Sequence, residues 1–194
     1  GFITGYGGLI CISRNGGASW TPFVTGTTVP FHGAAFASSF YGFAVGGGGT
    51  ICRYDGRTWT PTPTDTTTDF YGVAFAGRTP VAVGAGGIIC RYLDPRWIPV
   101  PSPTGADLYG VAFCDAEFGY AVGQGGTILR TRDGGVTWES SFVASNLDVR
   151  RVRIGDRANA WAVCAGGVVL ETRDGGDTWT PIPAGDADLL GIDF

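Results

Sequence analysis

The sequence predicts an all-β protein built from five copies of one four-stranded unit. Five tryptophans recur 39, 38, 41 and 41 residues apart, at Trp20, Trp59, Trp97, Trp138 and Trp179. A fixed period of about forty residues is typical of repeat proteins, in which each unit buries its apolar face only against its neighbours. Each unit also holds four short apolar runs, and none of them has the 3.6-residue period of a helix. Four antiparallel strands in such a repeat form the blade of a β-propeller.

The fourth unit, residues 107–140, gives the order of the elements most clearly. Its first run is LYGVAF, its second GYAVG and its third TILRT, and its fourth run begins at Trp138. Runs of this length that are rich in Val, Ile, Phe, Tyr and Thr are typical of strands. The G-x-G-G before the third run and the D-G-G before the fourth predict tight turns, because glycine adopts a positive φ without steric cost.

The two ends of the chain belong to the same unit. The chain opens at a second strand and stops after a first strand, DLLGIDF. Pairing of Leu189–Phe194 with Gly1–Gly5 would close a five-bladed ring and protect the inner strand edges. The alternative is a fragment of a larger ring. For the closed ring we expect a single domain, 1–194, with blades at about 189–194 plus 1–27, 28–66, 67–104, 105–145 and 146–186.

The composition excludes several classes of protein. Hydrophobic residues make up 44% and charged residues 15%, which argues for an ordered chain. A net charge of −4 argues against a nucleic-acid partner. No apolar run reaches about 18 residues, so we expect no transmembrane segment. The chain has neither a signal peptide nor a methionine, which favours a processed or trimmed form.

Cysteine and histidine are too few and too scattered to predict a metal site. Cys11, Cys52 and Cys90 share a third-strand column in which later units carry leucine, so we expect buried thiols. Cys114 and Cys164 lie on adjacent units and could form a disulfide. There is no C-x-x-C, and His32 is the only histidine. We therefore expect no metal and no cofactor.

One motif carries a resemblance to a known family. The segments SRNGGASW, TRDGGVTW and TRDGGDTW match the Asp-box pattern S/T-x-D-x-G-x-T-W. We interpret their residues as structural, because Asn or Asp bonds its own turn and the Trp packs on the sheet. These structural residues are Asn15, Trp20, Asp133, Trp138, Asp174 and Trp179. With YGVAF and FGYAVG-x-GG-TIL, the repeat resembles the photosystem II stability/assembly-factor-like group of BNR/Asp-box propellers over the full chain.

The resemblance implies a non-catalytic, usually exported propeller that holds protein partners. Assembly factors of that group are expected to have seven blades, whereas the repeats here number five. The localisation that follows is extracytoplasmic: periplasmic, lumenal or secreted. The leading hypothesis is therefore an interaction scaffold or assembly factor within a larger complex, and the alternative is a carbohydrate-binding lectin.

Aligned inner strands predict a binding site at the mouth of the central channel. One column holds His32, Tyr71, Tyr109, Arg150 and Leu190, and Arg151 follows in the chain. Tyrosine presents a rigid surface with a polar tip, and the arginine guanidinium can hold a carboxylate or phosphate. The predicted binding residues are Arg150, Arg151, Tyr71, Tyr109 and His32. The alternative is that these side chains only fill the rim.

Three further columns have structural interpretations. Arg153 and Asp193 share a column and are expected to pair at the closing seam. Arg53, Arg91 and Arg130 share a third-strand column and are expected to stack along neighbours or face solvent. Asp69, Asp107, Asp148 and Asp188 precede the inner strands. These aspartates could form a cation site or a dock for a basic partner, or each could cap its own turn.

The sequence predicts no enzyme. Glycoside hydrolysis needs two carboxylates about 5–9 Å apart with different roles. Among the inner strands only Asp193 offers a carboxylate, beside its expected arginine partner. The aspartate column could supply pairs, but nothing in the sequence separates an acid from a base. No G-x-S-x-G, P-loop or zinc signature is present. A glycoside hydrolase is therefore the least favoured alternative.

Overall fold

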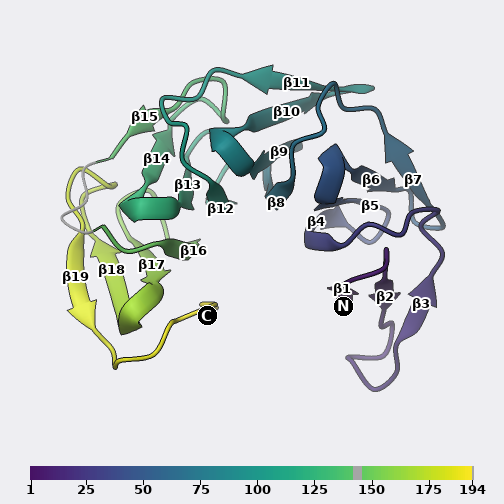
Figure 1. Ribbon diagram of the computed structural model, residues 1–194, viewed down its shortest axis with the longest axis horizontal. Helices are drawn as coiled ribbons and strands as arrows, with labels where there is room; N and C mark the ends of the chain where they lie inside the picture. Colours follow the sequence, from purple (N-terminus) through teal and green to yellow (C-terminus); the bar gives the residue numbers. More distant parts are fainter. Residues whose placement is uncertain (142–145, 194) are drawn as a thin grey trace.

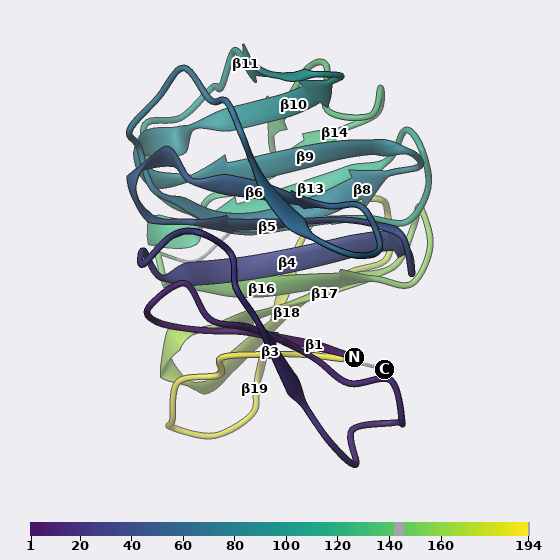
Figure 2. The same cartoon turned by 90° about the vertical axis from the view of Figure 1, so that its right-hand side faces the viewer.

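The structure, a computed structural model, describes residues 1–141 and 146–193. These residues form five antiparallel sheets that follow one another around a common axis, as in a β-propeller (Figure 1). Within each sheet the strands are hydrogen-bonded in chain order, from the axis outward. Figure 2 shows the strands of successive sheets stacked one above another. The predicted five-bladed propeller fold is confirmed.

The first sheet has three strands among the described residues, and the other four sheets have four strands each. The first sheet comprises β1 (Phe2–Thr4), β2 (Ile10–Ile12) and β3 (Thr21–Phe23). The second comprises β4 (Phe31–Ser38), β5 (Tyr41–Gly46), β6 (Ile51–Tyr54) and β7 (Trp59–Thr62). The third comprises β8 (Phe70–Ala76), β9 (Thr79–Gly84), β10 (Ile89–Leu93) and β11 (Arg96–Val100). The fourth comprises β12 (Leu108–Phe113), β13 (Gly119–Gly123), β14 (Ile128–Thr131) and β15 (Glu139–Ser140). The fifth comprises β16 (Val149–Ile154), β17 (Ala160–Cys164), β18 (Val168–Thr172) and β19 (Thr180–Pro183).

The glycine-rich turns between second and third strands form single 3₁₀ turns. Gly49 shows why they require glycine. Its φ is +73°, and a Cβ there would lie 2.0 Å from the Thr66 carbonyl oxygen. Side chains are therefore excluded from the turn, which lies against the crossing to the next sheet. The four turns are η1 (Gly47–Gly49), η2 (Ala85–Gly87), η3 (Gln124–Gly126) and η4 (Ala165–Gly167).

The hydrophobic core consists of four clusters, one between each pair of successive sheets among the described residues. The repeated tryptophan of the second to fifth sheets is buried, with an exposed fraction of 8% or less. Trp20 of the first sheet is 39% exposed, because no earlier sheet packs against its face. Each sheet therefore depends on a neighbour for burial, as the repeat length predicts.

The outer edge strands carry prolines that block further strand pairing. Proline lacks an N–H and is confined to sheet edges. It recurs two residues after the repeated tryptophan, at Pro22, Pro61, Pro99 and Pro181. In the fourth sheet Ser140 takes this position, on an edge strand of only two residues.

The five sheets form an open arc, and the predicted pairing of Leu189–Phe194 with Gly1–Gly5 is wrong. Residues 184–193 contain no strand, Phe194 lies outside the described residues, and β1 pairs only with β2 among those described. Figure 1 shows a wide opening between the two ends. The reason is local: the Leu189 N–H donates to the Cys164 carbonyl at 3.2 Å, which holds the segment on the fifth sheet.

Among the described residues, no helix has the length and apolar character needed to cross a membrane.

Candidate functional site

The candidate site is the central mouth, where the inner strands β4, β8, β12 and β16 meet. Near its start each of these strands carries an extra residue relative to its partner, which is a β-bulge, and β4 has a second bulge between Phe36 and Ser38. The strand register shifts between Phe31 and Gly33, so that the extra residue is His32. The equivalent extra residues of the other three strands are Tyr71, Tyr109 and Arg150. Because a bulge re-aims a side chain, the same column reaches the mouth in all four sheets.

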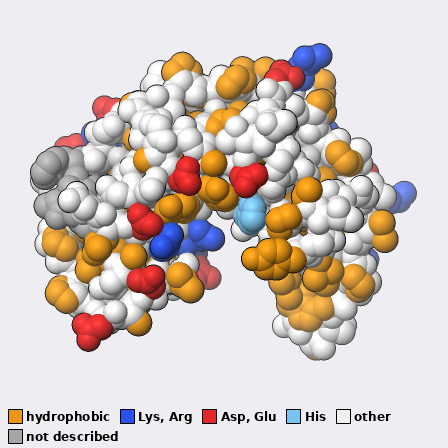
Figure 3. Space-filling model, viewed as in Figure 1, with side chains coloured by type: hydrophobic (Ala, Val, Ile, Leu, Met, Phe, Trp, Pro, Cys, Tyr) orange, Lys and Arg blue, Asp and Glu red, His pale blue; other side chains and the backbone are white. Residues whose placement is uncertain are grey.

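These side chains surround one cavity of about 350 Å³. Its lining is His32, Tyr71, Tyr109, Arg150, Arg151 and Leu190. All five predicted binding residues therefore lie together, joined by the leucine of the same column. Figure 3 shows arginine and histidine side chains on opposite flanks of the hollow in the arc.

The aromatic side chains form a continuous curved strip along the mouth. The His32 and Tyr71 ring centroids lie 5.6 Å apart, and those of Tyr71 and Tyr109 lie 6.0 Å apart. The Arg150 guanidinium carbon lies 5.2 Å from the Tyr109 ring centroid, a cation–π distance. The strip thus runs from an imidazole across two phenols to a guanidinium.

The three arginines of β16 have different partners. Arg150 lies 3.4 Å from the Asp148 carboxylate, while its buried Nε has no hydrogen-bond partner. Arg151 donates to the Tyr109 and Arg150 carbonyls at 2.9 and 2.8 Å, and desolvation lowers its pKa. Arg153 contacts Asp193 at 2.5 Å. This ion pair joins the end segment, residues 184–193, to β16, the inner strand of the fifth sheet.

One interpretation of the sequence expected each aspartate of this column to cap its own turn, and the structure shows a different contact. Each carboxylate instead accepts a hydrogen bond from the glycine-rich turn of the preceding sheet. Asp69 Oδ1 accepts from the Gly48 N–H at 2.7 Å, and Asp107 Oδ1 accepts from the Gly86 N–H at 2.8 Å. Asp148 and Asp188 accept in the same way from Gly125 and Gly166, at 3.0 and 2.8 Å. The aspartates therefore join successive sheets at the rim of the mouth.

Beneath the mouth the channel narrows and becomes apolar. A second cavity of about 140 Å³ continues from the first between Gly33, Gly72, Gly110 and small apolar side chains. A Cβ at Gly72 would lie 3.2 Å from the Gly110 Cα, so glycine permits the close approach of the inner strands. The titratable side chains of its lining, His32, Tyr71, Tyr109 and Arg151, are ones that also line the mouth.

The Asp-box residues form turns far from the mouth, at the opposite ends of the strands. Asp133 Oδ1 accepts from the Thr137 N–H at 2.9 Å, and its Oδ2 accepts from the Thr137 hydroxyl at 2.6 Å. Asp174 makes the same two bonds with Thr178, and hydrogen bonds from that side chain and backbone lower the pKa of Asp174 to about 2. Asn15 accepts from the Ser19 N–H at 2.9 Å.

The arginines of the third strands were expected to stack along neighbouring side chains or to face solvent, and Arg53 does lie over the Tyr41 ring, 5.2 Å from its centroid. Each reaches the turn between the third and fourth strands of the next sheet. Arg91 Nε donates to the Gly134 carbonyl at 3.1 Å, and Arg130 Nη1 donates to the Gly175 carbonyl at 2.6 Å. Arg53 lies 3.8 Å from Asp94. The regular spacing of this column was the signal for such contacts between sheets.

All five cysteines are free thiols, so Cys114 and Cys164 do not form a disulfide. Cys52 and Cys90 are buried, and Cys11 is half-buried. Burial raises the pKa of Cys52, Cys90 and Cys164 to about 11. These three thiols therefore belong to the core and not to a site.

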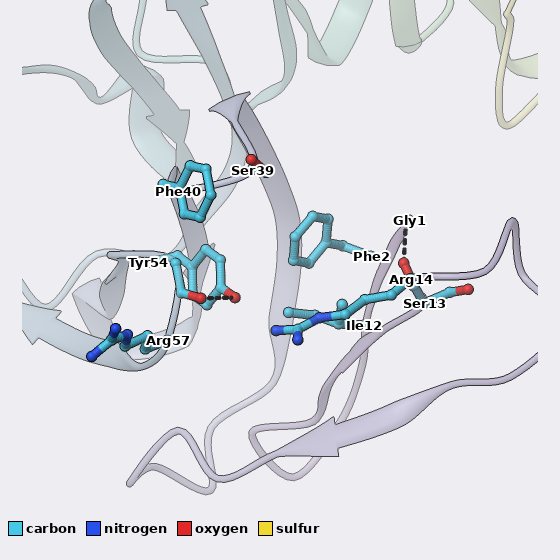
Figure 4. A pocket seen from close by; sticks show the side chains of 10 residues that line it. Gly1, Phe2, Ile12, Ser13, Arg14, Ser39, Phe40, Tyr54 and Arg57 are labelled. Atoms are coloured by element: carbon cyan, nitrogen blue, oxygen red, sulfur yellow. Dashed lines mark hydrogen bonds between the residues drawn. The ribbon is translucent and has the colours of Figure 1, made fainter.

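A larger cavity of about 730 Å³ lies between the first and second sheets, away from the mouth. Figure 4 shows Phe2, Phe40 and Tyr54 around it, with Arg14 on the side of the first sheet and Arg57 on the side of the second. Gly1 forms part of its wall. Although this cavity is larger, its polar side chains do not converge, so the mouth is the better candidate site.

Comparison with known proteins identifies related sequences and folds. The family model of the photosynthesis system II assembly factor YCF48 matches residues 93–190. No curated protein matches the chain. YCF48 from Cyanidioschyzon merolae is 16% identical with a TM-score of 0.74, over 100% of this chain and 70% of that one. YCF48 bound to D1 peptide is 20% identical with a TM-score of 0.72, over 93% of this chain and 62% of that one. An ancestral GH74 enzyme is 14% identical with a TM-score of 0.63, over 77% of this chain but 23% of the enzyme. At these identities the structural matches establish the fold alone.

Proposed function

Because the chain belongs to the photosynthesis system II assembly factor YCF48 family, we propose that it is a non-catalytic scaffold that binds protein partners during assembly. We place it within a larger complex in an extracytoplasmic compartment, whether periplasmic, lumenal or secreted. A related propeller has been solved with a D1 peptide, which supports a peptide segment as the ligand. We further propose that the five sheets act as one domain.

The observation that carries this proposal is the mouth cavity. Four successive sheets use the same bulge to present His32, Tyr71, Tyr109 and Arg150, and Arg151 lies beside them. A concave surface with rigid aromatic faces and a few convergent polar groups is typical of a binding site. The buried Arg150 Nε without a partner supports an anionic ligand group, since a guanidinium binds carboxylate well.

The carboxylates of the mouth support binding over catalysis. Asp69, Asp107, Asp148 and Asp188 share one contact, in which one carboxylate oxygen accepts from a glycine N–H of the preceding sheet, and Asp148 also pairs with Arg150. Glycoside hydrolysis requires one carboxylic acid and one carboxylate in different environments. The contact that all four share offers no basis for that division of roles.

The carbohydrate-binding alternative has less support. It would need similar grooves between the blades. The groove between the first and second sheets is about 730 Å³, whereas the groove between the second and third, lined by Arg53, Tyr92 and Asp94, is about 440 Å³. Unequal grooves do not favour a set of equivalent sugar sites.

A partner-capture experiment tests the proposal. We expect the double variant Arg150→Gln and Arg151→Gln to lose its co-purifying partner proteins, because both guanidinium groups line the cavity. The matched control is Arg173→Gln, whose side chain is 76% exposed on β18's outer turn. The control should retain its partners, and both variants should unfold at the wild-type temperature. Unchanged partner capture by the double variant would contradict the proposal, and glycan-array binding without protein partners would favour the lectin.

A further inference from the structure

The mouth is electrically divided. Its basic end holds Arg150 and Arg151 on β16. Asp69 and Asp107 lie at the rim, close enough to Tyr71 to act on it electrostatically, and make no ion pair among the described residues. Asp148, by contrast, is paired with Arg150. The rim is therefore cationic at β16 and anionic beside Tyr71, with Tyr109 between the two.

We propose that the mouth cavity selects a dipolar peptide segment, with a carboxylate side chain at Arg150 and Arg151 and a basic side chain at Asp69 and Asp107. This inference rests on the proposed function, because it names the chemistry of the partner segment that the same cavity binds. The aspartate column would then serve as a dock for a basic group, which is one of the interpretations of that column from the sequence.

The basic end can hold a carboxylate without dismantling the fold. Arg151 uses one terminal nitrogen on the carbonyls of Tyr109 and Arg150, so its other donors remain available. Arg150 is 32% exposed at its side chain and lies 3.4 Å from Asp148, a distance longer than a charge-assisted hydrogen bond. A ligand carboxylate can therefore share these two guanidinium groups.

The acidic end can hold a cation in the same way. Asp69 and Asp107 each use Oδ1 on a glycine N–H, which leaves Oδ2 as an acceptor. Tyr71 and Tyr109 are near enough to these aspartates to interact with them electrostatically, and a cation over a tyrosine face is attracted by the ring. Burial raises the pKa of Tyr71 and Tyr109, and the negative charge of the nearby aspartates raises it further.

The middle of the cavity suits the backbone of such a segment. The Tyr109 hydroxyl interacts with the Arg150 side chain, and the Tyr71 hydroxyl lies in the lining of the same cavity. Each can donate to a peptide carbonyl or accept from a peptide N–H. A cavity of about 350 Å³ accommodates a short stretch of chain, which places both charges of the ligand within a few residues.

Four fluorescent peptides test the inference. The probe is fluorescein-Gly-Gly-Lys-Ala-Asp-Gly-amide, and the other three replace Lys by Gln, Asp by Asn, or both. Fluorescence anisotropy measures each peptide against the wild type, against Arg150→Gln with Arg151→Gln, and against Asp69→Asn with Asp107→Asn. Asparagine keeps an acceptor for Gly48 and Gly86, so the second variant retains the turn contacts, which its unfolding temperature verifies.

We expect each single replacement in the peptide to weaken binding to the wild type by about 5-fold, the upper range for a solvent-accessible ion pair. The loss of Lys should have no effect on the asparagine variant, and the loss of Asp should have no effect on the glutamine variant. Equal sensitivity of wild type and asparagine variant to the Lys replacement would overturn the inference. Binding of no peptide would also overturn it, whereas the proposed function is decided separately by the partner-capture experiment.

Discussion

His32, Tyr71, Tyr109 and Arg150 reach the mouth because each is one residue more than its strand pair requires. The bulge leaves the residue outside the regular ladder and turns its side chain toward the axis. Glycine follows three of the four, and there it also allows neighbouring inner strands to approach. A single backbone irregularity, repeated from sheet to sheet, thus brings four residues that are far apart in the chain into one cavity.

The buried thiols should react slowly at neutral pH. Burial raises the pKa of Cys52, Cys90 and Cys164 to about 11, so only about one molecule in a thousand carries each thiolate at pH 8. Labelling with a disulfide reagent at pH 8 should give a fast phase from Cys11 and Cys114 and a slow phase from the other three. Addition of urea should release all five thiols at one rate.

The same thiols should lower stability in alkali. In the unfolded chain they lose protons near pH 9, whereas the folded protein retains them until about pH 11. The folded state then binds more protons than the unfolded state, so the free energy of unfolding falls as pH rises from about 9 to about 11. The variant Cys52→Ala should remove one thiol from the slow phase and flatten this fall. Five thiols of equal reactivity in the folded protein would contradict the assigned burial.

At the scale of the elements, successive sheets are held together at both ends of their strands. At the mouth, an aspartate from the crossing accepts from the glycine turn of the preceding sheet. At the opposite end, a third-strand arginine donates to the Asp-box turn of the following sheet. The apolar cluster between the two sheets lies between these polar contacts. Because each contact recurs from repeat to repeat, the residues that make it occupy equivalent positions when the repeats are aligned.

Arg130 should be the most important of these arginines for stability. Its side chain is 11% exposed and bonds Gly175, Asp177 and Glu139 at 2.6, 2.6 and 2.8 Å. Replacement by alanine removes the donor of the Gly175 carbonyl, while Arg132 still lies near both carboxylates, and should lower the free energy of unfolding by about 1–3 kcal/mol. Arg132→Ala is the matched control, because Arg132 is 59% exposed and its loss should cost about 0.5 kcal/mol or less. Equal urea midpoints for the two variants would show that the contact between sheets is weak.

At the scale of the whole molecule, the sequence predicts what repeats and does not predict how the repeats are rotated. The tryptophan spacing predicts five sheets, and the alignment of inner strands predicts the lining of the mouth, because equivalent positions meet around a common axis. The angle between sheets depends on the shapes of the four core clusters, which no single column encodes. The five sheets form an arc in which the matching ends of the chain do not meet (Figure 1), and the end segment stays on the fifth sheet.

Disulfide trapping should detect the opening in solution. In a closed ring, Leu189–Phe194 would pair with β1, and cysteines introduced by Thr4→Cys and Gly191→Cys would lie within the 4.4–6.8 Å Cα distance that a disulfide requires. In the open arc the end segment is held to the fifth sheet by Leu189 and by the Arg153–Asp193 pair, so this variant should remain reduced under mild oxidation. The positive control is Ile3→Cys, which lies opposite the native Cys11 on the neighbouring strand and should form a disulfide. Non-reducing mass spectrometry distinguishes the two outcomes. Rapid formation of the bond between positions 4 and 191 would mean that the end segment leaves the fifth sheet to complete the first, and the mouth would then lose Leu190 from its wall.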